Sequence, residues 1–220
     1  MKAFIERLKV KFTDLFLLVK EFVLKPTATW EQIVSYDESV GSLIKDRLLY
    51  YAAIPALATF LGVLIFGVRV PLTDTSGFSV VHRLPFGVVL LRAIFQYGFI
   101  IAGIWITSKI INYLAPRFGT VRNDQKAFTV AFYCSLPSML ASVAFLLPPL
   151  AFLTLIAGLY GAYLMYIGLP MLMQTPKDKQ LLYFITILAV SIVVYFILSQ
   201  IFSALEFSGN SDISSLPERF

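Results

Sequence analysis

The stretch LLYFITILAVSIVVYFILSQIFSAL, residues 181–205, decides the fold class because it contains no charged side chain. An α-helix rises about 1.5 Å per residue, so roughly 20 apolar residues suffice to cross about 30 Å of hydrocarbon. This stretch is long enough to do so without interruption. It therefore predicts a transmembrane helix.

Four more apolar runs of similar length precede that stretch. Hydrophobic residues make up 58% of the 220 residues and charged residues only 14%, and the mean hydropathy is +0.80. Soluble domains with mixed surfaces do not reach such values. We therefore predict an all-α membrane protein with five transmembrane helices. The predicted spans are residues 47–68, 86–111, 127–147, 150–171 and 181–205.

The N-terminal region before the spans, residues 1–45, predicts a helix of a different kind. Its apolar side chains recur at steps of three and four residues, so they occupy roughly one third of the helical circumference. Lysines flank this stripe and add attraction to anionic headgroups. We predict an amphipathic helix in the membrane interface, ended by Pro26, and a second short helix capped by Thr29-Trp30-Glu31-Gln32. The stripe comprises Phe4, Ile5, Leu8, Phe12, Leu15, Phe16, Val19, Phe22 and Val23.

The distribution of lysine and arginine predicts the orientation of the chain. Fourteen of these residues lie before the first span or in the second and fourth connections between spans, and three lie on the opposite side. Short positive loops are retained in the cytoplasm during insertion. Residues 1–45 are therefore expected to be cytoplasmic, residues 46–206 to form the five-span domain, and residues 207–220 to form a polar tail outside.

Side chains that carry catalysis are scarce in the predicted spans. No Asp or Glu occurs in residues 47–73, 75–123 or 125–177, and the chain has one cysteine, Cys134, and one histidine, His82. These residues provide neither a metal-ligand cluster nor the carboxylates of a proton relay, and no hydrolase motif is present. We therefore expect no enzymatic activity, no metal and no cofactor. Because the basic residues gather at the ends of the apolar runs, the expected partner is the lipid bilayer and not nucleic acid.

Three prolines occur inside predicted spans, each four residues after a tyrosine. A proline has no backbone N–H and clashes with the preceding turn, so each would free the carbonyl of that tyrosine and allow a kink. The pairs are Tyr51 and Pro55, Tyr133 and Pro137, and Tyr166 and Pro170.

Two of these segments also match each other. Residues 50–56, YYAAIPA, parallel residues 132–138, FYCSLPS, position by position in residue class. Both segments would cross the membrane in the same direction. We therefore consider a parallel two-span repeat, an arrangement found in some transporters.

Small residues form a groove on the fourth predicted span. Gly158 and Gly161 each have an alanine four residues away, and such spacing lets two helix backbones approach closely in lipid. The groove is expected to serve packing within the bundle, and the alternative is a homo-oligomer formed through the fourth span.

Arg92 is the one formal charge well inside a predicted span. An unpaired cation at that depth is costly, so some compensation is expected. Its long side chain can reach the headgroups unaided. The alternative is an ion pair with Glu206, which would lie in the same leaflet at the end of the fifth span.

Four segments, taken in this order along the chain, resemble the Yip family of multi-pass membrane proteins, especially its short bacterial inner-membrane members. The resemblance implies a membrane scaffold or adaptor with a cytoplasmic N-terminus and protein partners at the cytoplasmic face. Binding of Rab-type GTPases is not carried over, because the Asp-Leu-Tyr-Gly-Pro motif is missing before the first span. The alternative function is a small transporter, channel or lipid-handling protein. The four segments are KPTATW at 25–30, YAAIP at 51–55, AFYCSLP at 131–137 and GLYGAYLMYIGLP at 158–170.

Overall fold

The computed structural model describes the backbone of residues 2–35, 38–71, 79–146, 150 and 152–210. Side chains are described for residues 13–35, 38–68, 81–146, 150 and 152–200. Within these ranges five helical segments are long and apolar enough to cross a membrane, which confirms the predicted all-α, five-span class. The segments are Val40–Phe66, Phe86–Phe118, Asp124–Leu146, Phe152–Met173 and Lys177–Gln200.

Two helices precede the first span: α1 (Lys2–Leu24) and α2 (Pro26–Ser35). The prediction that Pro26 ends the first helix is confirmed. The predicted cap at Thr29 is wrong, because α2 already begins at Pro26 and the Thr29 hydroxyl donates to the Lys25 carbonyl oxygen at 2.9 Å. A proline at the first position of a helix needs no hydrogen-bond partner for its nitrogen, so the helix starts there.

The first span has three parts: α3 (Val40–Leu43), the π-helical turn η1 (Ile44–Leu48) and α4 (Leu49–Phe66). Gly67, at a φ of +70°, ends α4 and leads into a short antiparallel hairpin. The hairpin pairs β1 (Val68–Pro71) with β2 (Ser79–His82), in a register that places Val68 opposite His82. This hairpin connects the first two spans and was not predicted.

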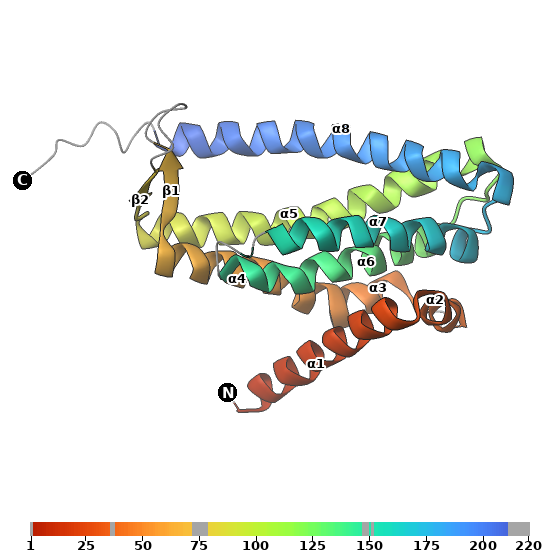
Figure 1. The fold of residues 1–220 in the computed structure, drawn as a ribbon, viewed down its shortest axis with the longest axis horizontal. Helices are drawn as coiled ribbons and strands as arrows, with labels where there is room; N and C mark the ends of the chain where they lie inside the picture. Colours follow the sequence, from red (N-terminus) through yellow and green to blue (C-terminus); the bar gives the residue numbers. More distant parts are fainter. Residues whose placement is uncertain (1, 36–37, 72–78, 147–149, 151, 211–220) are drawn as a thin grey trace, which may run out of the picture.

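Figure 1 shows the spans side by side, with consecutive spans running in opposite directions. One end of the bundle carries α2 and the connections after η2 and α7, and we call it the basic end. The other carries the hairpin, and we call it the hairpin end. The four remaining spans consist of α5 (Phe86–Leu114) with η2 (Ala115–Phe118), α6 (Asp124–Ala141) with η3 (Ser142–Leu146), α7 (Phe152–Met173) and α8 (Lys177–Asn210).

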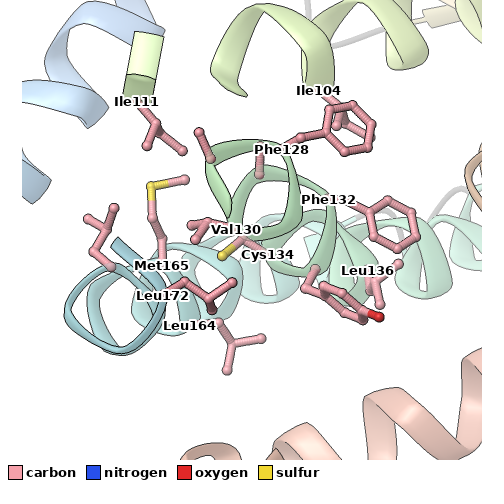
Figure 2. Close-up of a cluster of buried hydrophobic side chains, with 14 of the residues drawn as sticks. Ile104, Ile111, Phe128, Val130, Phe132, Cys134, Leu136, Leu164, Met165 and Leu172 are labelled. Carbon is pink, nitrogen blue, oxygen red and sulfur yellow. The ribbon is translucent and has the colours of Figure 1, made fainter. Parts of the chain in front are cut away.

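Helix α6 lies at the centre of the bundle. It contacts α1, α3, α4, α5 and α7, whereas α8 packs against α5, α7 and η2. The most apolar window of the α6 span is 56% buried, compared with 11% for the α8 span. Around α6, Figure 2 shows Ile104 and Ile111 from α5 on one side and Leu164 and Leu172 from α7 on the other. The outer faces of α5 and α8 are therefore left to the lipid.

The second half of α1 packs against the bundle. Leu15 and Phe22 are fully buried and Val19 nearly so, whereas Phe16 and Val23 are exposed. One part of the predicted apolar stripe therefore packs against the bundle, and the other part is exposed on the surface of the protein. The side chains of residues 4–12, which form its first half, lie outside the described part of the chain.

Candidate functional site

Trp30 on α2 forms the centre of an aromatic cluster at the basic end. Its side chain is fully buried, with ring centroids 5.3 Å from Phe22 of α1 and 6.1 Å from Tyr133 of α6, both edge to face. On α7, a Cβ added at Gly168 would lie only 2.6 Å from the Trp30 Cζ2 atom. Trp30 therefore joins α2 to α1, α6 and α7, and this contact with α7 requires a glycine at position 168.

A polar bridge lies beside this cluster. Arg47, in the π-helical turn, donates through Nη1 to the Tyr133 hydroxyl at 2.8 Å, and its Nη2 lies 3.4 Å from Glu38 Oε2. Gln125 of α6 donates to the Glu38 carbonyl oxygen at 3.0 Å. Single π-helical turns often occur at functional sites. The bridge fixes the chain before the first span to the start of the third.

A third contact fastens α1 to α7. The Tyr160 hydroxyl donates to the Phe22 carbonyl oxygen at 2.7 Å. That carbonyl is four residues before Pro26, so it has no helical N–H to accept. The Tyr160 hydroxyl thus satisfies a carbonyl that Pro26 leaves without its helical partner.

The three prolines singled out by the sequence, Pro55, Pro137 and Pro170, lie inside α4, α6 and α7. The carbonyl of Tyr166, four residues before Pro170, accepts a hydrogen bond from the Gln180 Nε2 at 2.9 Å. The freed carbonyl thus joins α7 to α8.

Tyr51 stacks on Phe132 at 6.3 Å with the rings 10° apart, so the two matching segments 50–56 and 132–138 contact each other. Helices α4 and α6 run in the same direction in Figure 1. This common direction is necessary for the two-span repeat, which stays a prediction.

The small-residue groove of α7 is only partly occupied. A Cβ added at Gly161 would collide with the Cys134 carbonyl oxygen of α6, whereas one at Gly158 would meet only the Ser138 Oγ at 3.8 Å. Gly158 is exposed and Gly161 is buried. Packing within the bundle therefore uses Gly161 and leaves the Gly158 side of the groove open.

Arg92 is half-buried on α5. The backbone of α8 continues through Glu206, but the side chain of Glu206 lies outside the described residues. The ion pair between them stays a prediction.

The double charge swap tests that pair. Arg92→Glu and Glu206→Arg should each lower the melting temperature in detergent, because each places two like charges close together, and the double variant should recover part of the loss. Arg92→Lys serves as a control that keeps the charge. Losses that add strictly in the double variant would show that the two residues do not meet.

Sequence reasoning selected Tyr51 and Tyr133 but missed several residues of this site. The sequence places Arg47 at a span boundary, Trp30 in a predicted helix cap and in a segment that resembles the Yip family, and Gly168 in another such segment. A single buried tryptophan opposite a helical glycine becomes recognisable as a pair only in the folded chain. The missed residues are Phe22, Trp30, Glu38, Arg47 and Gly168.

Together these contacts define the class: a five-span helical membrane protein whose N-terminal helices are docked on one end of the bundle. Three of the four segments, 25–30, 131–137 and 158–170, contribute to that docking, and the fourth, 51–55, stacks on Phe132 of α6. The sequence model of the Yip1 domain matches residues 20–199. The chain belongs to the Yip1 family.

The curated relatives include the inner membrane protein YohC of Escherichia coli strain K12 and the protein of the same name from Escherichia coli O6:H1. Each is 23% identical to this chain over 172 residues, which cover 77% of this chain and 85% of the relative. No solved structure matches the chain.

Proposed function

We propose that this protein is a non-enzymatic adaptor of a bacterial inner membrane, whose basic end binds partner proteins and organises the surrounding lipids. The observation that carries the proposal is the convergence of three of the four family segments on Trp30, through Tyr133 and Gly168. Residues that are far apart in sequence thereby pack together at one end of the bundle.

The hydrogen bonds at the basic end support a rigid binding surface, which we call the platform, and not a reaction centre. Arg47 is engaged with Tyr133 and Glu38, and Tyr160 with the Phe22 carbonyl. Side chains held in this way position helices. The solvent-exposed face of α2 would then be the part of the platform that partners contact.

We further propose that the basic end faces the cytoplasm. The excess of lysine and arginine at this end supports it, and the relative from Escherichia coli carries "inner membrane protein" in its name. The C-terminal tail, residues 207–220, would then lie outside.

Reporter fusions test the orientation. Alkaline phosphatase fused after Phe220 should be active, because the enzyme matures only outside the cytoplasm, and the same reporter fused after Asn123 should be inactive. A fluorescent protein that matures only in the cytoplasm should give the opposite pattern at both positions. Activity after Asn123 and none after Phe220 would overturn the orientation.

Photo-crosslinking in intact cells tests the adaptor role. Val34 on α2 and Val81 on β2 are equally exposed, at 49% and 50%, so a photoreactive amino acid at each position gives a matched pair. A discrete crosslinked product at Val34, absent at Val81 and lost when Gly168→Leu disrupts the docking of α2, is the expected result. The same pattern at both positions, or none at either, would contradict a partner site at the basic end.

Self-association is a second candidate, favoured by the open side of the α7 groove. Leu159 beside Gly158 is exposed. A crosslinker at Leu159 should then give a product of twice the mass of the chain, and Gly158→Leu should abolish it.

A further inference from the structure

The connection between α5 and α6 holds two guanidinium groups on one aromatic ring. The Cζ atoms of Arg117 and Arg122 lie 5.5 Å and 5.8 Å from the ring centroid of Tyr113. Arg117 belongs to η2 and Arg122 to the loop before α6. The Tyr113 ring is itself 62% exposed, and both arginines are exposed.

Two like charges on one ring repel each other unless an anion lies between or beside them. Asp124 is the nearest carboxylate in the sequence, and it already binds Lys109 Nζ at 2.6 Å and Asn112 Nδ2 at 3.0 Å. Within the described residues, neither Arg117 nor Arg122 forms an ion pair. The charge of Asp124 also interacts with that of the nearby Arg122. One carboxylate beside Lys109, Arg117 and Arg122 still leaves an excess of positive charge at this connection.

The surroundings place this pair at the membrane surface. Trp105, whose ring lies 5.3 Å from Lys109 Nζ, and Tyr113 are both exposed near the end of the second span. Trp and Tyr are enriched where hydrocarbon meets headgroups. Val121, next to Arg122, is 84% exposed, and an apolar side chain so exposed gains by entering a lipid surface.

The connection that carries Val121 is fixed in place. The Thr120 backbone N–H donates to the Ala115 carbonyl oxygen at 3.0 Å, and its hydroxyl donates to Thr175 Oγ1 at 3.3 Å. The arginine, tyrosine and valine side chains are therefore presented from an anchored loop.

We propose that Tyr113, Arg117 and Arg122 form a binding site for the phosphate of an anionic phospholipid headgroup, with Trp105 and Val121 seated in the same lipid interface. Planar guanidinium groups bind phosphate oxygens in pairs, and two of them lie within 6 Å of the same ring here. The site rests on the proposed function, because it names the lipid class that the basic end would organise.

The experiment uses the purified full chain in a neutral detergent and counts bound lipids by native mass spectrometry during titration. The probes are phosphatidylglycerol, phosphatidylcholine and inorganic phosphate. No cellular partner is present, so a failure here is distinguishable from a failure of the crosslinking test. We expect phosphatidylglycerol to bind more tightly than phosphatidylcholine and to resist competition by inorganic phosphate at millimolar concentration.

Two variants of equal charge change separate a built site from general attraction. Arg117→Gln/Arg122→Gln should weaken phosphatidylglycerol binding about tenfold or more, since both basic residues attract the anionic headgroup. Lys25→Gln/Lys45→Gln, which removes two exposed charges of the basic end from other elements, should change it less than twofold. An equal loss in both pairs, or equal binding of phosphatidylcholine, would overturn the site.

The role of the Tyr113 ring can be tested separately. Tyr113→Leu should weaken phosphatidylglycerol binding, because the ring that aligns the two guanidiniums is lost, whereas Tyr113→Phe should leave it unchanged. Displacement of the lipid by inorganic phosphate would show that the site serves free phosphate and would overturn the lipid assignment. Melting temperatures of all variants within a few degrees of the wild type verify that they fold.

Discussion

Replacing Gly161 by leucine should destabilise the bundle more than any other single exchange on α7. A Cβ at this position collides with the backbone carbonyl oxygen of Cys134, and a backbone atom cannot rotate away as a side chain can. Forcing extra carbon atoms into a packed interface typically costs about 1–3 kcal/mol. We expect the upper part of that range and a clearly lower melting temperature in detergent, because α7 must move away from the central helix α6.

Gly158→Leu is the matched control. It makes the same exchange on the same helix, but Gly158 is exposed and an added Cβ meets only a side-chain oxygen at 3.8 Å. Replacing glycine by leucine also favours the helix by up to about 1 kcal/mol. The melting temperature of Gly158→Leu should therefore stay unchanged or rise. A loss equal to that of Gly161→Leu would show that the close approach of α6 and α7 is not what Gly161 provides.

The spans could be predicted from the sequence because the membrane imposes a local rule. A helix that crosses hydrocarbon must be apolar over about 20 consecutive residues, and this rule needs no knowledge of the partners of a residue. The observed span Phe86–Phe118 contains the predicted span 86–111 and continues seven residues beyond it. Helix boundaries at interfaces depend on caps and turns, which are less regular.

The hairpin between the first two spans had a weak signal. Val68 and Val70 alternate with Arg69, and Val80 and Val81 follow at the other end of the connection. Short runs rich in β-branched residues favour strands. Each valine-rich run is too short to be distinguished from the apolar end of a span. Only the pairing of the two runs in the folded chain identifies them as strands.

The aromatic cluster around Trp30 and the polar bridge beside it were predictable only in part. The tyrosines four residues before prolines marked Tyr51 and Tyr133, because that spacing frees a carbonyl inside a helix. The role of Arg47 could not be derived, since it depends on Glu38 and on a hydroxyl from the third span. Trp30 likewise has no local signal beyond its size, because its neighbours come from α1, α6 and α7.

Trp30→Ala should release the N-terminal helices from the bundle. The side chain is fully buried, and truncating a buried tryptophan to alanine typically costs about 3–5 kcal/mol. Much of that free energy holds α2 on α7, so the expected result is rapid tryptic cleavage after Lys25 while the five spans stay protected. Trp30→Phe should be far milder, because it keeps a ring in the cluster and removes the indole Nε1, a buried donor with no acceptor among the described residues. An unsatisfied buried donor costs about 1–3 kcal/mol.

Gly168→Ala tests the same contact from the opposite side. Its Cβ would lie 2.6 Å from Cζ2 and 2.9 Å from Cη2 of Trp30, and a rigid indole ring can yield only if α2 shifts. We therefore expect Gly168→Ala to increase cleavage after Lys25. Cζ2 and Cη2 belong to the part of the indole that phenylalanine does not reach, whereas Cε2, at 2.8 Å, lies nearer the part that it fills. Trp30→Phe should therefore reduce the effect of Gly168→Ala in the double variant. If the factors by which the two single exchanges change the cleavage rate simply multiply in the double variant, Trp30 and Gly168 are not coupled. In that case α2 is held by the polar bridge of Arg47 and Glu38 instead.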